Sequence, residues 1–226
     1  MNGTSISFQA NGGSCGGHLS FPESGSGPGV IVLQEWWGLV DHIKDVVDRF
    51  AEAGFTALAP DLYHGESTTH PDDAGRMMMA LNIADTAKDL AGAVSFLADH
   101  EAVSSSKIGT VGFCMGGQLS LFAACANDQI GACVDFYGIH PNVQPDFANL
   151  RAPVLGIFAE LDEFVTPDNA NELKAKLESH GHSPDFHIFP RVNHAFFNDS
   201  RPDVYDADVA GKAWRLVKDF FSENLE

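Results

Sequence analysis

Basic residues are scarce in this chain of 226 residues. It has 13 lysines and arginines against 31 aspartates and glutamates, which gives a formal net charge of −18. Such a charge repels phosphate backbones and anionic membrane surfaces, so we expect no nucleic-acid partner and no membrane partner. The acidic excess predicts a solvated surface, with adaptation to salt as the alternative.

Long apolar runs and disulfide patterns are also missing. No run approaches the roughly 18 apolar residues of a membrane span, and residues 1–10 lack the basic and apolar regions of a signal peptide. The four cysteines, Cys15, Cys114, Cys125 and Cys133, form no CxxC pair and are too few to staple a chain of this length. We therefore expect a cytoplasmic protein with reduced thiols.

What the chain does contain is ample material for a core. It is 44% hydrophobic and only 19% charged, a balance typical of a globular protein. At about 150 residues per domain, its length favours one large domain over residues 1–226. We expect a monomer or a small homo-oligomer.

Short apolar segments alternate with helical ones from residue 29 onward. The segments predicted as strands are residues 29–34, 55–59, 108–113, 130–137, 154–159 and 185–189. Their continuous apolarity is typical of strands covered on both faces, so the pattern predicts an α/β fold with a mostly parallel, doubly wound sheet and helices on both faces. Residues 5–9 and 16–21 alternate in polarity around Asn11-Gly12-Gly13, which predicts an antiparallel edge hairpin.

Apolar residues at helical spacing predict helices near residues 40–50, 83–97 and 209–220. Thr166-Pro167 begins another helix, which closes near Gly181. The three consecutive methionines at residues 77–79 are expected in a helix core or a pocket lining.

One strand leads directly into a motif that can carry chemistry. Residues 108–113 run into Gly112-Phe113-Cys114-Met115-Gly116-Gly117 and then into a predicted helix over residues 118–126. A strand, a tight turn with small neighbours and a helix are the setting of a nucleophile elbow, here with cysteine in place of serine. The alternative is a buried, inert cysteine.

An acid and a base follow two later predicted strands. Asp162 comes after residues 154–159, and His194 comes after residues 185–189. The order nucleophile, acid, histidine resembles that of α/β-hydrolases, and all three residues fall at carboxyl ends of strands, where open α/β sheets place ligands.

Other roles for these two residues stay open. Asp162 is also a candidate cap for the helix near Pro167, and Glu160 and Glu163 are rival acids. His194 competes with nine other histidines. Of these, His180, His182 and His187 lack the carboxylate or thiol companions of a metal site, so we expect neither metal nor cofactor.

Glu35-Trp36-Trp37-Gly38 ends an early strand and begins a helix. In this architecture an oxyanion hole is built from the residue after the nucleophile and an early strand-to-helix loop, which makes the backbone N–H groups of Met115 and Trp36 its candidates. Glu35 would then lie near the thiol. It either accepts backbone hydrogen bonds or controls the thiol proton.

With these residues in view, the whole chain resembles the dienelactone hydrolase family of α/β-hydrolases. The motifs that carry the resemblance are residues 34–39 (QEWWGL), 59–63 (APDLY), 112–117 (GFCMGG), Asp162 with Val165 and Pro167, 194–198 (HAFFN) with Arg201-Pro202, and Ala213-Trp214. The resemblance implies Cys114 as nucleophile, His194 as base, Asp162 as its orienting acid, and Glu35 as the group that takes the thiol proton when substrate arrives.

The resemblance also bears on the substrate. Family members that open dienelactone carry an arginine in the helix after the Tyr motif, which Arg76 matches. They carry a second arginine at the position four residues after the catalytic histidine. This chain has Asn198 at that position, and Arg201 is the candidate replacement. The residues expected to bind substrate are Trp37, Tyr63, Arg76, Tyr137 and Phe197.

These observations predict a hydrolase that cleaves a small-molecule lactone or activated ester through a thioester acyl-enzyme, with little peptidase activity. A general carboxylesterase or thioesterase differs only in substrate. A non-catalytic binding protein on the same fold is the alternative from another class.

Overall fold

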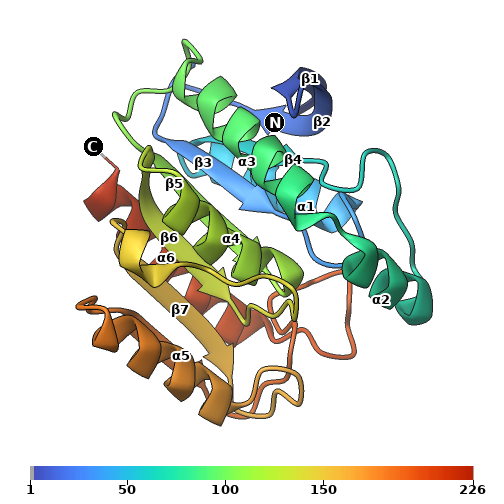
Figure 1. Ribbon diagram of the computed structural model, residues 1–226, viewed down its shortest axis with the longest axis vertical. Coiled ribbons are helices and arrows are strands. Elements are labelled where there is room, and N and C mark those ends of the chain that lie inside the picture. Colours follow the sequence, from blue (N-terminus) through green and yellow to red (C-terminus); the bar gives the residue numbers. More distant parts are fainter. Residues whose placement is uncertain (1–2, 226) are drawn as a thin grey trace.

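The computed structural model describes residues 3–225, which form a twisted sheet between two layers of helices (Figure 1). The strands are β1 (Thr4–Ala10), β2 (Gly13–Ser20), β3 (Gly29–Leu33), β4 (Thr56–Pro60), β5 (Ile108–Phe113), β6 (Ile130–Phe136), β7 (Val154–Ala159) and β8 (Asp185–Phe189). The helices are α1 (Asp41–Glu52), α2 (Pro71–Ala80), α3 (Ile83–Ala98), α4 (Met115–Ala126), α5 (Pro167–Ser179) and α6 (Ala207–Asn224), with a short 3-10 helix at Phe147–Asn149.

The strand order is β1-β2-β4-β3-β5-β6-β7-β8. From β4 to β8 all neighbouring strands are parallel, whereas β2 pairs antiparallel with both β1 and β4. The predicted mixed α/β architecture and its edge hairpin are therefore confirmed. The hairpin turns at Asn11 and Gly12, both with positive φ, as a two-residue turn between right-twisted strands requires.

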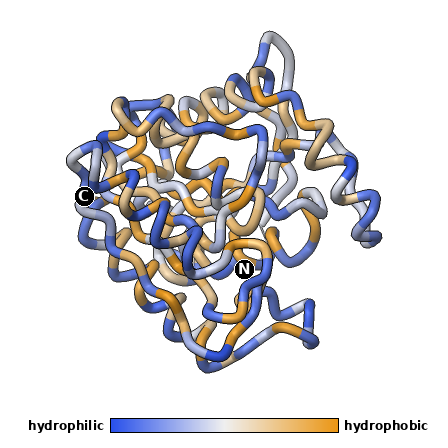
Figure 2. Tube along the Cα trace, turned by 60° about the horizontal axis from the view of Figure 1, so that its bottom comes forward, coloured by the Kyte–Doolittle hydropathy of each residue, from blue (hydrophilic) through white to orange (hydrophobic). Residues whose placement is uncertain are grey.

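Each central strand has two apolar faces because each face is covered by helices. Val30 and Val32 of β3 lie in the core beneath α1 and α6, whereas Ile31 and Leu33 lie in the core beneath α3 and α4. This explains why the predicted strands were continuously apolar rather than alternating. In Figure 2 hydrophobic and hydrophilic residues alternate along the helices, as expected for helices with one face on the sheet and the other in water.

Several predicted boundaries were wrong by one to three residues. Strand β6 ends at Phe136, not at Tyr137, because Tyr137 has a φ of 41°, which no strand residue adopts. Helix α4 begins at Met115 rather than at residue 118, directly after Cys114. Strand β3 ends one residue early, at Leu33, and β4 is displaced by one residue, to Thr56–Pro60.

Candidate active site

Cys114 occupies the sharp turn between β5 and α4. Its backbone lies at φ 54° and ψ −119°, a strained conformation for a residue with a side chain. Hydrogen bonds hold this turn on both sides, because the Cys114 N–H donates to Phe136 O (3.0 Å) and the Ile139 N–H donates to Cys114 O (3.1 Å). The predicted elbow is thus present and anchored to the end of β6.

The elbow is possible only because the residues two positions before and two positions after Cys114 are glycines. A Cβ at Gly112 would overlap the carbonyl of Gly116, and a Cβ at Gly116 would overlap the carbonyl of Leu33. The glycines therefore allow α4 to approach β3 and β5 closely, so that the thiol projects from the carboxyl edge of the sheet.

Asp162 and His194 meet at the same edge. The His194 Nδ1 lies 2.7 Å from Asp162 Oδ2, and the other Asp162 oxygen accepts hydrogen bonds from the Phe164 and Val165 N–H groups (2.8 and 2.9 Å). The Asp162 side chain is fully buried and that of His194 is 13% exposed. The backbone hydrogen bonds therefore fix the Asp162 carboxylate, and the fixed carboxylate orients the imidazole.

His194 and Cys114 line the same cavity. Burial disfavours the charged form of His194, but the hydrogen bond to Asp162 and the nearby Cys114 outweigh burial and raise the pKa of His194 to about 10. The ring lies between Tyr137 and Phe164, with ring centroids 4.7 and 5.2 Å away. The two aromatic rings and Asp162 therefore hold the imidazole in one orientation, in the cavity that it shares with Cys114.

Neither the capping role of Asp162 nor its two rival acids fit the geometry. Thr166 caps α5 through a reciprocal pair with Asn169, so Asp162 is not needed as a cap of that helix. Glu160 is exposed and accepts from the Arg191 N–H (2.8 Å), and Glu163 is exposed. Asp162 is therefore the acid that holds His194.

Glu35 lies 1% exposed at the end of β3 and shares a cavity with Cys114 and His194. Its Oε2 accepts from Asn198 Nδ2 at 2.7 Å. Burial raises the pKa of Glu35, opposed by the nearby imidazoles of His42 and His194 and by the Asn198 amide. Asn198 was singled out in the sequence only as the place of a missing arginine, and its bond to Glu35 joins positions 163 residues apart.

The cavity over the thiol has a volume of about 350 Å³, a size suited to a small organic molecule. Its lining is mostly apolar, with carboxylate, imidazole, thiol and guanidinium groups from Glu35, His194, Cys114 and Arg201; the rest comes from Trp36, Trp37, Pro71, Met78, Ile139, Phe164 and Ala195. The sequence did not indicate Pro71, Ile139 or Phe164 as lining residues, because their segments carry no chemical signal.

Only one of the five residues expected to bind substrate, Trp37, lines this cavity. Tyr63 lies beneath the elbow, its hydroxyl 3.2 Å from Met115 Sδ. Tyr137 packs on His194, and Phe197 is buried and stacks on Phe113 with ring centroids 5.2 Å apart. These three aromatic residues support the site from behind.

Arg76 lies on another side of α2. It is exposed, pairs with Asp73 and lines a separate hollow with Tyr63. Two residues along a helix are about 200° apart, so when Met78 faces the cavity, Arg76 faces away from it. The arginine that does line the cavity is Arg201, which also pairs with Asp203 at 2.8 Å.

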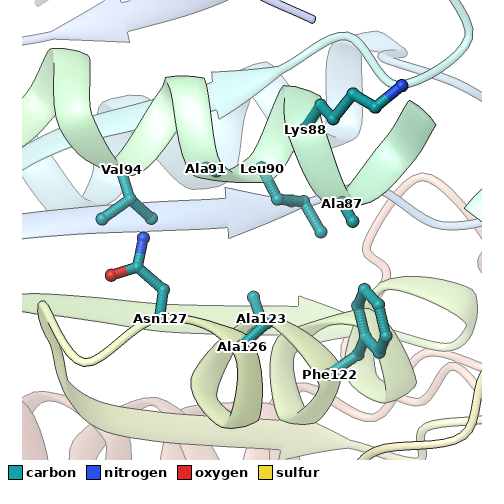
Figure 3. Close-up of a pocket in the computed structure, with 9 residues that line it drawn as sticks. All are labelled: Ala87, Lys88, Leu90, Ala91, Val94, Phe122, Ala123, Ala126 and Asn127. Carbon is teal, nitrogen blue, oxygen red and sulfur yellow. The ribbon is translucent and has the colours of Figure 1, made fainter. Parts of the chain in front are cut away.

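Another hollow, between α3 and α4, is lined by no carboxylate, imidazole or thiol group (Figure 3). Its lining is mainly alanine and other apolar side chains, and its lysine, Lys88, pairs with Asp85 at 2.8 Å. Within residues 3–225 no group of three or more His, Cys, Asp or Glu side chains could hold a metal ion. No helix in the same range is long and apolar enough to cross a membrane.

The chain is similar to several known proteins of one family. The model of the dienelactone hydrolase family matches residues 16–225. The chain is 41% identical to "Protein usf" of Aquifex pyrophilus over 99% of both chains, and 35% identical to a "Putative carboxymethylenebutenolidase" of Aquifex aeolicus over 99% of this chain and 100% of that one. A solved "Putative Dienelactone Hydrolase" of Klebsiella pneumoniae superposes with a TM-score of 0.88 at 26% identity, covering 97% of this chain and 98% of the other. The chain therefore belongs to the dienelactone hydrolase family and is a hydrolase that acts on esters.

Proposed function

We propose that this hydrolase opens small lactones and activated carboxylic esters through a Cys114-His194-Asp162 triad and a thioester intermediate. The observation that carries the proposal is the placement of the Cys114 thiol on a strained elbow, in one cavity with an imidazole that a buried carboxylate holds at 2.7 Å. Nucleophile, base and orienting acid are the parts that covalent acyl transfer requires.

In the first half of the reaction, Cys114 loses its proton to Glu35 as substrate enters, and the thiolate attacks the carbonyl carbon. Met115 is the first residue of α4, so its N–H has no acceptor within the helix and is available, with the Trp36 N–H, to bind the oxyanion. The carbon–oxygen bond then breaks, and His194 protonates the leaving oxygen.

In the second half, His194 takes a proton from water, and the resulting hydroxide attacks the thioester carbonyl. The carbon–sulfur bond breaks, the carboxylic acid is released, and the proton that Glu35 took in the first half returns to sulfur, which restores the thiol. A thiolate is expelled readily from its adduct, which favours esters with good leaving groups over amides.

Hydrolysis of an aryl acetate tests the proposal. We expect wild-type protein to release phenolate, and Cys114→Ala to lose at least about 10³-fold of that rate. Cys125→Ala is the matched control, since Cys125 is also 8% exposed and lies at the other end of α4. Equal traces from wild type and Cys114→Ala would instead support a protein that binds esters without turnover.

Trapping the intermediate separates the triad from an ester hydrolase that works in another way. Quenching the reaction with acid during turnover should leave an acetyl group on Cys114, detected by peptide mass spectrometry. A wild-type rate without acylation of Cys114 would contradict the thioester mechanism.

A further inference from the structure

A polar cavity adjoins the catalytic one. It has a volume of about 590 Å³, against about 350 Å³ for the cavity over Cys114. Trp37 and Arg201 line both cavities, so a molecule bound over the thiol can extend past these two side chains into the polar cavity. Polar residues that line the larger cavity but take no part in the proposed reaction are Asp41, Lys44, Ser67, Thr68, Thr69 and Ser200.

One wall of the polar cavity is fixed to the loop that follows β3. Gly38 and Ser67 form an isolated antiparallel bridge, and the Thr68 N–H donates to Trp37 O at 3.0 Å. Gly38 has a φ of 96°, and a Cβ at this position would overlap the Glu66 carbonyl oxygen, so the close approach requires glycine. This wall therefore holds its hydroxyl-bearing side chains beside Trp37 before any substrate binds.

A second wall belongs to the turn that follows His194. There Asn198 Oδ1 accepts from the Ser200 N–H at 3.1 Å and from the Ser200 hydroxyl at 2.6 Å. Asn198 Nδ2 donates to the Glu35 carboxylate at 2.7 Å, inside the catalytic cavity. One turn thus joins the two cavities, and a preformed site of this kind binds a ligand without a large cost for ordering its own residues.

The lining of the polar cavity favours an uncharged ligand that carries hydroxyl groups. Lys44 pairs with Asp41 at 3.2 Å and Arg201 pairs with Asp203 at 2.8 Å, so each cation already has a carboxylate beside it. An anion would compete with these carboxylates, whereas a hydroxyl group donates to a carboxylate and accepts from an ammonium group. An apolar group would displace water from the polar side chains without replacing its hydrogen bonds.

We propose that the polar cavity binds a hydroxylated side chain of the substrate while the lactone or ester carbonyl lies over Cys114. This inference rests on the proposed function and narrows its substrate class to lactones and esters that carry a polyhydroxylated side chain. Trp37, at the junction of the two cavities, offers an aromatic surface to the C–H groups of such a side chain.

Two lactones that differ only in their side chain test the inference. One is a γ-butyrolactone with a vicinal dihydroxyethyl group, and the other carries a sec-butyl group of nearly the same shape. We expect wild-type protein to favour the dihydroxy lactone by about 10-fold in kcat/KM, measured by acid release at constant pH, because two hydroxyl groups gain partners in the cavity. Equal values, or a preference for the sec-butyl lactone, would overturn the inference.

Two variants of the polar cavity should weaken this preference. Lys44→Met removes an ammonium donor but keeps the aliphatic stem, and Thr69→Phe fills the cavity; we expect the preference to fall by about 3- to 10-fold in each. Lys88→Met is the matched control, because Lys88 also pairs with an aspartate three residues earlier, Asp85, but lines the apolar hollow between α3 and α4. Lys88→Met should keep the wild-type preference. An unchanged preference in either cavity variant would contradict the assignment.

Binding to Cys114→Ala separates this inference from the proposed function. Calorimetric titration of Cys114→Ala with each lactone measures binding without turnover, and the dihydroxy lactone should bind about 10-fold more tightly. Equal affinities would overturn the inference even if wild-type protein hydrolyses both lactones. Tighter binding of the dihydroxy lactone, together with a wild-type protein that hydrolyses neither, would refute the proposed function alone.

Discussion

Asp162 divides its two oxygens between separate tasks. One accepts the Phe164 and Val165 N–H groups, and the other holds His194. Because the backbone bonds fix the carboxylate, its negative charge stays beside His194 Nδ1 and favours the imidazolium form, in line with the raised pKa of His194. The charge on Asp162 is therefore more important than its shape.

Asp162→Asn tests that statement. The amide keeps the volume of the side chain but removes its negative charge, so we expect kcat to fall by about 10³- to 10⁴-fold with little change in KM. The pKa of His194, about 10 in the wild type, should also fall, as an NMR titration of the ring would record. Glu163→Gln, at the exposed neighbouring carboxylate, should keep normal kinetics. A similar loss of kcat in Glu163→Gln would mean that Glu163, and not Asp162, is the acid that assists His194.

Arg201 is the cation that a carboxylate on the substrate would meet in the cavity. With a panel of esters that differ only in a carboxylate, Arg201→Gln should raise KM about 10- to 100-fold for anionic members and leave neutral members unchanged. Arg76→Gln should change neither, since Arg76 is exposed and lines a different hollow. If Arg76→Gln instead raised KM for the anionic esters alone, Arg76 would be the substrate-binding arginine, as expected from the sequence.

These residues show what the sequence could and could not predict about the site. Cys114, Asp162 and His194 could be proposed from the sequence because each follows a predicted strand, and the structure places all three at one edge of the sheet. Arg76 was misplaced because a side chain's direction on a helix depends on how the helix is rotated against the rest of the protein, which tertiary packing decides. The contact between Glu35 and Asn198 depends on tertiary folding alone.

At the scale of elements, strands were predicted better than helix ends. The bounds of β5, β7 and β8 were predicted without error, because β5 and β7 are short, fully buried apolar segments and β8, a partly exposed edge strand, lies between Pro184 and Pro190. The start of α4 was missed because Gly116-Gly117 predicts a turn by local propensity. Tertiary packing overrides that propensity, since only glycine permits the approach to β3.

Glycine-to-alanine changes in β5 and in α6 should separate the effect of tertiary packing from that of local helix propensity. Gly112→Ala puts a methyl group against the Gly116 carbonyl, so we expect the free energy of unfolding to fall by about 1–3 kcal/mol and esterase activity to fall with it. Gly211→Ala on α6 meets only Arg215 at 3.9 Å and should raise the free energy of unfolding by about 0.5–1 kcal/mol. Urea denaturation measures both, and equal shifts would contradict the close approach at the elbow.

At the scale of the whole molecule, most of the acidic residues behind the net charge of −18 are solvated, but the carboxyl groups of Glu35, Asp89, Asp135 and Asp162 are buried. Asp135 is fully buried in β6, beneath the turn that carries Gly138. Burial raises the pKa of its carboxyl to about 7, and the Gly138 N–H offsets this only in part. The protein therefore holds a proton at Asp135 that the unfolded chain releases near pH 4.

The sign of the resulting pH dependence follows from proton counting. Between about pH 4 and pH 7 the folded protein binds one more proton at Asp135 than the unfolded chain does, so stability from this site is complete below pH 4 and is lost as pH rises through 7. The loss is about 1.4 kcal/mol per pH unit, or about 4 kcal/mol in total.

Asp135→Asn removes this dependence while keeping the shape of the side chain. The free energy of unfolding of Asp135→Asn relative to wild type should therefore rise from pH 4.5 to about 7 and then level off, as urea titrations at successive pH values would measure. Asp128→Asn, at an exposed aspartate just before β6, should show a constant difference. If Asp135→Asn also gives a constant difference, the carboxyl is ionised in the folded protein and has a partner that compensates for its burial.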